Sequence, residues 1–391
     1  MKRFAAQYVF TGRTAPLKRA IITVHDDGTI LDIEKGSGGL REKQSVEFYN
    51  GIIVPGFVNC HCHLELSHLK GAVPEGEGLG SFLMNVSRLR AYEQEKILAA
   101  AVREDRSMWN EGTGLCADVC NTPVTFSLKK SSRISYISLA EVFGIDPSKT
   151  GKRISELIGL INKAEDENIP VYPVPHTAYS VPLRLFRALR EISLQNRVTS
   201  IHFMESKAET EFLETHSGSL WKAFGERGLL PAELDIPASH VSAVINEVTP
   251  AGNLLLVHNT FADSATVREV NKRGNTFWCL CPGSNLYIEK SLPPVQMLMD
   301  EGCRIVLGTD SLSSNKRLSM LEEMKIISAG FPSLPFDELL KWATANGAAA
   351  LGEEGNFGVI EAGKKPGLVL IEDFDLQNMK LLPESTARRL V

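Results

Sequence analysis

Eight apolar runs rich in β-forming residues alternate with longer segments of helical periodicity, and this alternation constrains the fold more than any other feature. The runs span residues 52–63, 114–120, 134–143, 171–176, 198–205, 253–258, 275–282 and 304–310. Strands that alternate with helices form βα units around a parallel sheet, and eight such units favour a closed barrel over an open sheet. We therefore predict an α/β fold, a (β/α)8 TIM barrel.

The two ends of the chain carry short strand and turn signals instead. Residues 1–50 include QYVFTG and AIITVHDDGTILDIE, and residues 356–374 read NFGVIEAGKKPGLVLIEDF. We predict that the termini, residues 1–50 and 355–391, pair into a small β-sandwich domain beside a barrel of residues 51–354. Segment 214–250 is long for a βα connection, and because a long loop on a barrel face often covers the substrate, this segment is a candidate lid.

Charge and composition exclude several classes of protein. The 391 residues include 42 basic and 47 acidic side chains, a net charge of −5 without blocks of one sign, which argues against a nucleic-acid or membrane partner. No apolar stretch approaches a signal peptide or a membrane span. Seven scattered cysteines fit reduced thiols better than a disulfide framework. We expect a cytoplasmic protein, and we allow for a homodimer.

A His-x-His motif ends the first run. In a strand, residues i and i+2 point to the same side, so His61 and His63 both face the mouth of the predicted barrel, while Cys62 points the other way. Two imidazole nitrogens held side by side provide half of a metal site. The alternative is a pair of ordinary polar residues, and the position at a strand end favours the metal site.

Further polar residues end four other runs. His176 ends the fourth run, His202 and Glu205 the fifth, His258 the sixth and Asp310 the eighth. The C-terminal ends of barrel strands carry the chemistry of barrel enzymes. Because buried charge without a partner is costly, this convergence indicates a metal or a substrate.

Seven motifs resemble, in this order along the chain, those of the amidohydrolase superfamily: HCH after PGFVN, PHTAYSV, HFMES, HNT, CPGSN, GTDSLSSN and ATANGA. The nearest branch is similar to the metal-dependent aminohydrolases, which include cytosine, guanine and S-adenosylhomocysteine deaminases and the chlorohydrolases. The resemblance covers nearly the whole chain, including the split β-domain. It implies one divalent metal ion, with zinc favoured and iron the alternative, held by His61, His63, His202 and Asp310.

The resemblance also implies a division of labour around that metal. Binuclear members carry a carboxylated lysine after strand four, where this chain has His176, so we favour one metal and assign His176 to the substrate. A divalent cation lowers the pKa of a water molecule that it binds to about 7. Asp310 would take the water proton, His258 would hold the water, and Glu205 would protonate the substrate ring and then the departing ammonia.

The function that follows is hydrolytic deamination, in which a ring C–NH2 of a nucleobase, nucleoside or related heterocycle becomes C=O. The string HxHLELS resembles members that deaminate aminodeoxyfutalosine, an adenine-type nucleoside, which is our lead substrate. Two alternatives on the same scaffold are a chlorohydrolase and a cyclic-amide hydrolase. A metal-free binding barrel is disfavoured, because every expected ligand is present.

Three further interpretations concern single residues. Glu65 either lines the substrate pocket or is a carboxylate at a helix start. Asn285 either contacts the substrate or shapes the loop after strand seven. We expect the remaining histidines of the terminal domain and the long loop, His25, His216 and His240, to lie on the surface.

Overall fold

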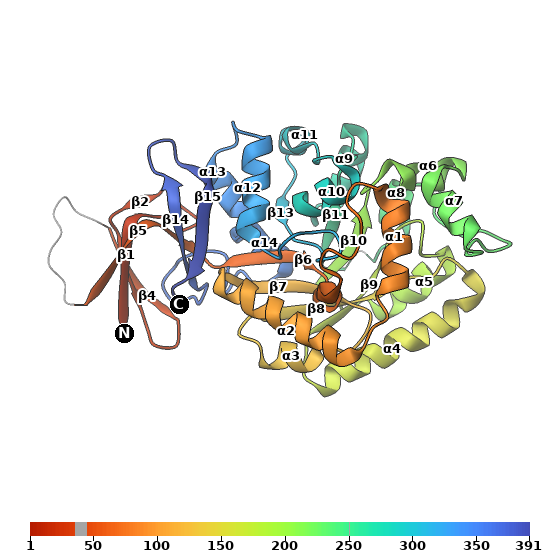
Figure 1. Ribbon diagram of the computed structural model, residues 1–391, viewed down its shortest axis with the longest axis horizontal. Helices are drawn as coiled ribbons and strands as arrows, with labels where there is room; N and C mark the ends of the chain where they lie inside the picture. Colours follow the sequence, from red (N-terminus) through yellow and green to blue (C-terminus); the bar gives the residue numbers. More distant parts are fainter. Residues whose placement is uncertain (36–44, 250) are drawn as a thin grey trace.

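The computed structural model describes residues 1–35, 45–249 and 251–391. Two four-stranded parallel sheets form its centre, with helices outside them (Figure 1). The first contains β6 (Phe57–Cys62), β7 (Thr113–Cys120), β8 (Ser135–Val142) and β9 (Val171–Pro175). The second contains β10 (Val198–Phe203), β11 (Asn253–His258), β12 (Thr276–Leu280) and β13 (Ile305–Leu307). Each of these strands lies within one of the eight apolar runs, except that β7 begins one residue before its run.

The two sheets meet at both of their edges, where single bridges replace continuous ladders. One parallel bridge joins Cys62 to Asp310, and the other joins Thr177 to His202. The amide of Asp310 donates to the carbonyl of His61 over 3.0 Å, and a Cβ atom on the neighbouring Gly308 would lie only 2.8 Å from Cβ of His61. Glycine therefore permits this close approach. Both seams carry predicted site residues.

Helices cover the outside of these strands. The helices are α1 (Gly78–Leu89), α2 (Gln94–Asn110), α3 (Phe126–Ser131), α4 (Thr150–Asp166), α5 (Leu183–Ile192), α6 (Lys207–Thr215), α7 (Gly218–Glu226), α8 (His240–Ser242), α9 (Ser264–Asn271), α10 (Pro282–Glu289), α11 (Val295–Asp300), α12 (Met320–Gly330), α13 (Phe336–Trp342) and α14 (Ala345–Leu351). Helix α4 shows why they pack: Leu157, Leu160 and Ala164 are buried at spacings of three and four residues. Burial of each leucine contributes about 2 kcal/mol.

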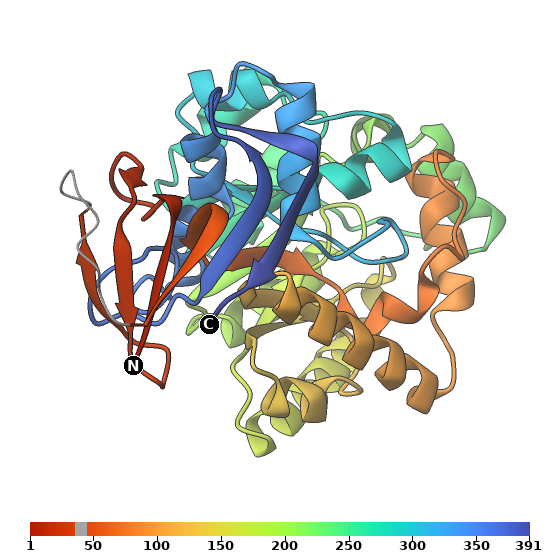
Figure 2. The ribbon, with the colours of Figure 1, turned by 60° about the vertical axis from the view of Figure 1, so that its left-hand side comes forward.

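The chain termini form one mixed sheet at one end of the molecule (Figures 1 and 2). Its strands are β1 (Lys2–Val9), β2 (Leu17–Lys18), β3 (Ile21–Val24), β4 (Ile30–Glu34), β5 (Val46–Pro55), β14 (Leu368–Asp375) and β15 (Lys380–Arg389). The termini pair, as predicted, but in a single sheet and not in a sandwich of two sheets. The reason is β5, which pairs with β1 on one edge and with β14 on the other.

Arg389, in β15 of the terminal sheet, contacts the end of helix α2 and the residues that follow it. Its guanidinium lies 3.6 Å from the ring centroid of Trp109, and its Nη2 atom donates to the carbonyl of Gly112 over 3.0 Å. Strand β5 continues to Pro55, past the domain boundary expected at residue 50. The division of the chain into residues 1–50 with 355–391 and residues 51–354 stays a prediction.

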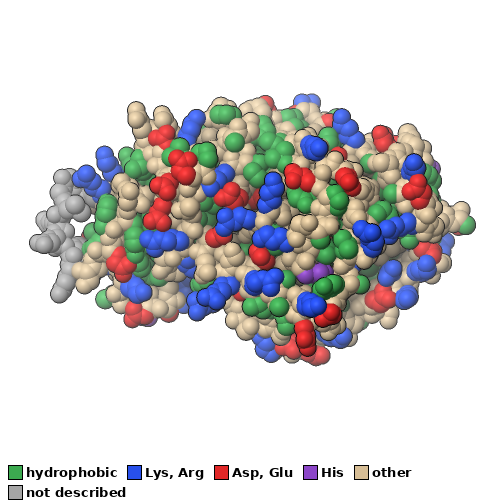
Figure 3. Space-filling view, viewed as in Figure 1, with side chains coloured by type: hydrophobic (Ala, Val, Ile, Leu, Met, Phe, Trp, Pro, Cys, Tyr) green, Lys and Arg blue, Asp and Glu red, His purple; other side chains and the backbone are tan. Residues whose placement is uncertain are grey.

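None of the helices in the described part of the chain combines the length and the apolar character that a bilayer crossing needs. Acidic and basic side chains are interspersed over the face drawn in Figure 3.

Candidate active site

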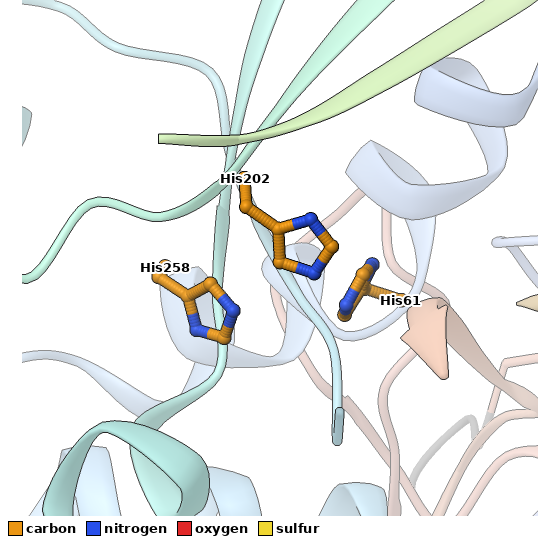
Figure 4. Close-up of side chains that lie close together, drawn as sticks. All are labelled: His61, His202 and His258. Atoms are coloured by element: carbon orange, nitrogen blue, oxygen red, sulfur yellow. The ribbon is translucent and has the colours of Figure 1, made fainter. Parts of the chain in front are cut away.

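Histidines from three strands converge at the carboxyl ends of the central sheets. Figure 4 shows the rings of His61, His202 and His258 facing one another. Their possible ligand atoms all lie within 4.8 Å of one another, and the same limit holds for the group of His61, His63 and Asp310. The structure thus brings the four predicted ligands and His258 into one buried cluster.

Three imidazoles of this cluster, those of His63, His202 and His258, have lowered pKa values that favour the form that binds metal. Burial, followed by the neighbouring His61, lowers the pKa of His63 to about 3. Burial also lowers the pKa of His258 to about 4 and the pKa of His202 well below its usual value. Neutral imidazoles offer a lone pair, which coordination requires.

Hydrogen bonds on the far side of two rings select the tautomer. Nδ1 of His202 donates to the carbonyl oxygen of His176 over 3.2 Å, and Nδ1 of His258 donates to Oδ1 of Asn285 over 3.0 Å. In both rings Nε2 is left as the lone-pair atom, and such outer partners are typical of metal-binding histidines. Nε2 of His258 is buried without a hydrogen-bond partner among the described residues.

Asp310 presents one carboxylate oxygen to the cluster and anchors the other. Oδ1 lies 3.5 Å from Nε2 of His61 and 3.4 Å from Nε2 of His63. Oδ2 accepts from the hydroxyl of Ser284 over 2.7 Å and from that of Ser314. Burial alone would raise the pKa of Asp310. The hydrogen bond to His61 and the charge interactions with His63 and His258 outweigh burial and hold this pKa well below its usual range. Three imidazoles and one carboxylate match the donor set of zinc.

Three strained backbone positions aim these side chains. His258 and Asp310 have φ values of +79° and +55°, and Met204, directly before Glu205, has φ +49°. The left-handed conformation costs residues other than glycine on the order of 1–3 kcal/mol each, and such positions cluster at functional sites.

Glu205 is placed as a proton carrier. It follows β10, is 5% exposed, and its Oε1 atom lies 3.6 Å from Nε2 of His258. Burial, followed by the charges of Glu209 and Asp310, raises the pKa of Glu205 well above its usual value. A raised pKa favours the protonated carboxyl group, which is the form that can donate a proton.

A cavity of about 380 Å³ opens above the cluster. Part of its lining is polar and comes from the cluster and its neighbours: His63, His176, His202, Glu205, His258 and Asp310. Aromatic and aliphatic side chains form most of its walls, including Leu66, Phe82, Phe143, Tyr179 and Phe224. Two arginines, Arg90 and Arg153, also line it. The cavity suits a flat apolar group with a polar edge and a charged substituent.

The three residues assigned to substrate lie at different depths. His176 lines the cavity, with Nδ1 2.8 Å from Oγ of Ser180, and burial lowers its pKa to about 4. Glu65 is 4% exposed and accepts hydrogen bonds from Arg90 and from the amide and hydroxyl of Thr122. Asn285 is 1% exposed and lies behind His258. Substrate contact by these residues stays a prediction.

The structure adds residues that the motif reading missed. Asp118, inside β7, accepts from the amide of Leu64, directly after His63, over 2.7 Å and pairs with buried Lys129 over 2.6 Å. Glu141, at the end of β8, lies 3.6 Å from Nδ1 of His202, and burial raises its pKa to about 7. A lone acid in an otherwise apolar run was the available signal in both cases.

Segment 214–250 differs from expectation at one histidine. His240 was expected on the surface, but it is 5% exposed, because its ring packs against Phe203 and its Nε2 atom lies 3.1 Å from Oε2 of Glu209. Phe224 and Leu229 of this segment line the cavity. Movement of the segment as a lid stays a prediction.

The sequence of the chain is similar to those of known proteins. The Amidohydrolase family matches residues 52–386. The chain is 28% identical to 5′-deoxyadenosine deaminase of Methanobrevibacter smithii over 352 aligned residues. The alignment covers 86% of this chain and 75% of that relative.

Two solved structures share the fold. Helicobacter pylori aminofutalosine deaminase, in complex with methylthio-coformycin, has a TM-score of 0.78 at 23% identity, over 96% of this chain and 93% of that one. Atrazine chlorohydrolase from Arthrobacter aurescens, complexed with zinc, has a TM-score of 0.71 at 17% identity, over 98% and 89%. The chain therefore belongs to the Amidohydrolase family and is a hydrolase that acts on carbon–nitrogen bonds.

Proposed function

We propose that this protein is a metal-dependent deaminase that converts the C–NH2 group of an adenine-type nucleoside to C=O and releases ammonia. One observation carries the proposal: buried Glu205, with its raised pKa, faces the same cavity as the His/Asp cluster and lies 3.6 Å from His258. Removal of an amino group from an aromatic ring requires a proton donor beside the attacking water. Glu205 would be the donor, and His258 would hold the water beside it.

The residues that would hold the metal are His61, His63, His202 and Asp310, which offer three nitrogen atoms and one oxygen. Zinc is the favoured ion, because the donor set suits it and the related chlorohydrolase structure contains it, and iron is the alternative. When bound, the ion would lower the pKa of a water molecule to about 7.

The chain's own residues carry the proton transfers in this proposal. Nε2 of His258, unprotonated because Nδ1 donates to Asn285, holds the attacking water by accepting its hydrogen bond. Oδ1 of Asp310 takes the water proton, since Oδ2 is occupied by two serine hydroxyls. Glu205 gives its proton to the ring nitrogen, which makes the neighbouring carbon more electrophilic. The proton held by Asp310 then passes to the amino group, which leaves as ammonia, while Glu205 takes back a proton from the new hydroxyl group as the C=O bond forms.

The cavity supports a substrate larger than a free base. Its volume of about 380 Å³ and its aromatic walls fit a purine, and Arg90 and Arg153 would face a substituent beyond the ribose. The lead substrate is aminodeoxyfutalosine, in line with the likeness to aminofutalosine deaminase, and 5′-deoxyadenosine is the second choice.

We also infer that the two parallel sheets close into one (β/α)8 barrel. The support is that their edges meet at both seams, through the Cys62–Asp310 and Thr177–His202 bridges. A closed barrel would place all eight carboxyl ends around the cavity.

The direct test is ammonia release from a panel of aminodeoxyfutalosine, 5′-deoxyadenosine, adenosine, S-adenosylhomocysteine, guanine and cytosine. We expect turnover of one or more adenine nucleosides. Glu205→Gln should retain the metal and lose activity by about 10²–10⁴-fold, because it removes a proton carrier and no ligand. Glu214→Gln, at an exposed glutamate nine residues away in the same region, is the control.

The alternative function is hydrolysis of a chloride or a cyclic amide. Because the fold is similar to that of atrazine chlorohydrolase, the assay should also include a chlorinated substrate and a cyclic amide. Release of chloride or of a ring-opened acid, with no ammonia from any amine in the panel, would replace deamination as the conclusion.

A further inference from the structure

We propose that Glu209 and His240 form a buried pair that positions Glu205, so that segment 214–250 anchors the proton donor of the active site. This inference rests on the proposed function, because it concerns how the proton donor is held. It assigns a role to a histidine and a glutamate that no ligand or proton-transfer role accounts for.

The geometry begins at Glu209, in the first turn of α6. Its side chain is fully buried, and Oε1 accepts hydrogen bonds from the amide of Glu205 over 2.7 Å and from the amide of Ser206 over 2.9 Å. The bond to Ser206 completes the capping box of α6. The bond to Glu205 reaches one residue further and is not needed to cap the helix.

The additional bond satisfies the buried backbone amide of Glu205. Strand β10 ends at Phe203, and Met204 takes the left-handed conformation with φ +49°, which turns the Glu205 side chain into the cavity. The amide of Glu205 is then buried beyond the reach of a strand partner, and a buried amide requires an acceptor. Glu209 supplies this acceptor, while the carbonyl of Met204 accepts from the amide of Phe261 over 3.0 Å.

His240 holds Glu209 from the other side. Its Nε2 atom lies 3.1 Å from Oε2 of Glu209, and its ring packs edge-on against Phe203 at 5.5 Å between centroids. Ser239 caps the short helix α8 that begins with His240, and this cap orders the backbone that carries His240. Without His240, Oε2 of Glu209 would be buried without a hydrogen-bond donor, which is unfavourable. The Glu209 side chain would then be free to move away from the amide of Glu205.

The pair therefore links two parts of the chain that the reaction needs together. The walls of the cavity include Phe224 and Leu229 from segment 214–250. His240 connects the same segment to Glu209, which in turn bonds to the amide of Glu205. The negative charge of Glu209 is also the largest contribution after burial to the raised pKa of Glu205. Position and proton affinity of Glu205 depend on the same neighbour.

The test compares Glu209→Ala and His240→Ala with matched controls on the metal-loaded protein. Glu214→Ala removes an exposed glutamate from the same helix, and His216→Ala removes an exposed histidine from the same segment. We expect kcat to fall by about 10–100-fold for the first two variants, with KM and metal content unchanged, and no change for the controls. If Glu209→Ala or His240→Ala does not fold, Glu209→Met and His240→Phe take its place, because they keep most of the side-chain volume and remove the acceptor and the donor.

A double-mutant cycle separates positioning from a general loss of structure. If Glu209 acts through Glu205, then Glu209→Ala should cost less than about threefold further activity in the Glu205→Gln background. Losses that multiply in full would overturn the proposal, because they would mean that Glu209 acts independently of Glu205.

Hydrogen exchange gives a readout that does not depend on the substrate. In Glu209→Ala and His240→Ala, the peptide spanning residues 203–206 should exchange about tenfold faster or more, while β11 should be unchanged. Unaltered exchange would overturn the proposal. If the wild-type protein releases no ammonia from any substrate, the proposed function fails, and the exchange result alone decides whether Glu209 holds this backbone.

Discussion

Nδ1 of His258 donates a hydrogen bond to Oδ1 of Asn285 over 3.0 Å, and Nδ2 of Asn285 returns one to the backbone carbonyl of His258 over 3.3 Å. This reciprocal pair defines both the orientation of the amide and the tautomer of the ring. Nε2 of His258 is consequently an acceptor, and it points toward Glu205 at 3.6 Å. Asn285 thus controls which proton-transfer role His258 can take.

Replacement of Asn285 should therefore affect turnover more than metal binding. Asn285→Leu has a similar volume but no acceptor, so the ring of His258 can adopt the other tautomer, and we expect kcat to fall by about 10–100-fold. Asn285→Asp retains the acceptor and should lose less. Steady-state kinetics with metal analysis of the same preparations checks this, and a Leu variant with wild-type kcat would contradict it.

The hydroxyl of Ser284 should matter for metal affinity, because it orients Asp310. Ser284→Ala removes the donor to Oδ2, which frees the carboxylate to rotate away from His61 and His63. We expect zinc affinity to fall by about 10–100-fold in a competition titration with a chelator. Ser313→Ala is the matched control, because that hydroxyl bonds to Ser311 and not to Asp310. Equal affinities for both variants would argue against this role.

Local periodicity explains why much of this site could be predicted. The spacing of His61 and His63 directs both rings to one side of a strand, and the strand-end positions of His202, His258 and Asp310 bring them to the same face. These conclusions need only the period of a strand and the order of parallel strands. The alternation of eight runs with helices likewise placed β6 to β13.

The remaining features of the site could not be predicted, because they depend on contacts between residues far apart in the sequence. His240 reaches Glu209 across 31 residues, and neither residue belongs to a periodic pattern that names the other. The direction of the Glu65 side chain depends on the amides of Asn121 and Thr122, which arrive from the next βα unit. The same holds for β5, whose two partners come from opposite ends of the chain and make one sheet in place of a sandwich.

The stability of the protein should depend on pH through Glu323. This carboxyl accepts from the amide of Gly283 and the amide group of Asn315, and burial raises its pKa from 4.5 to about 8. Between these values the folded protein holds a proton that the unfolded chain has lost, so the free energy of unfolding decreases as pH rises from 4.5 to 8.

Glu323→Gln removes this contribution. Relative to the wild type, the variant should gain on the order of 3 kcal/mol in the free energy of unfolding between about pH 5 and 8, whatever its offset at pH 5. Urea unfolding at several pH values measures the difference, with Glu322→Gln on the same helix as control. Wild-type and Glu323→Gln curves that run parallel over this range would contradict the assignment.

Arg153 should select substrates by the group beyond the ribose. Nη1 pairs with Glu156 over 3.0 Å, while Nε is buried without a hydrogen-bond partner among the described residues and packs over Gly144 in the cavity wall. A charge-assisted hydrogen bond to a substrate carboxylate contributes about 1.5–3 kcal/mol. Arg153→Met should therefore raise KM by about tenfold or more for S-adenosylhomocysteine, which carries a carboxylate, and leave KM for 5′-deoxyadenosine unchanged. Lys152→Met, on the exposed face of the same helix, is the control. An equal rise in KM for both nucleosides would mean that Arg153 supports the cavity wall and does not read the substituent.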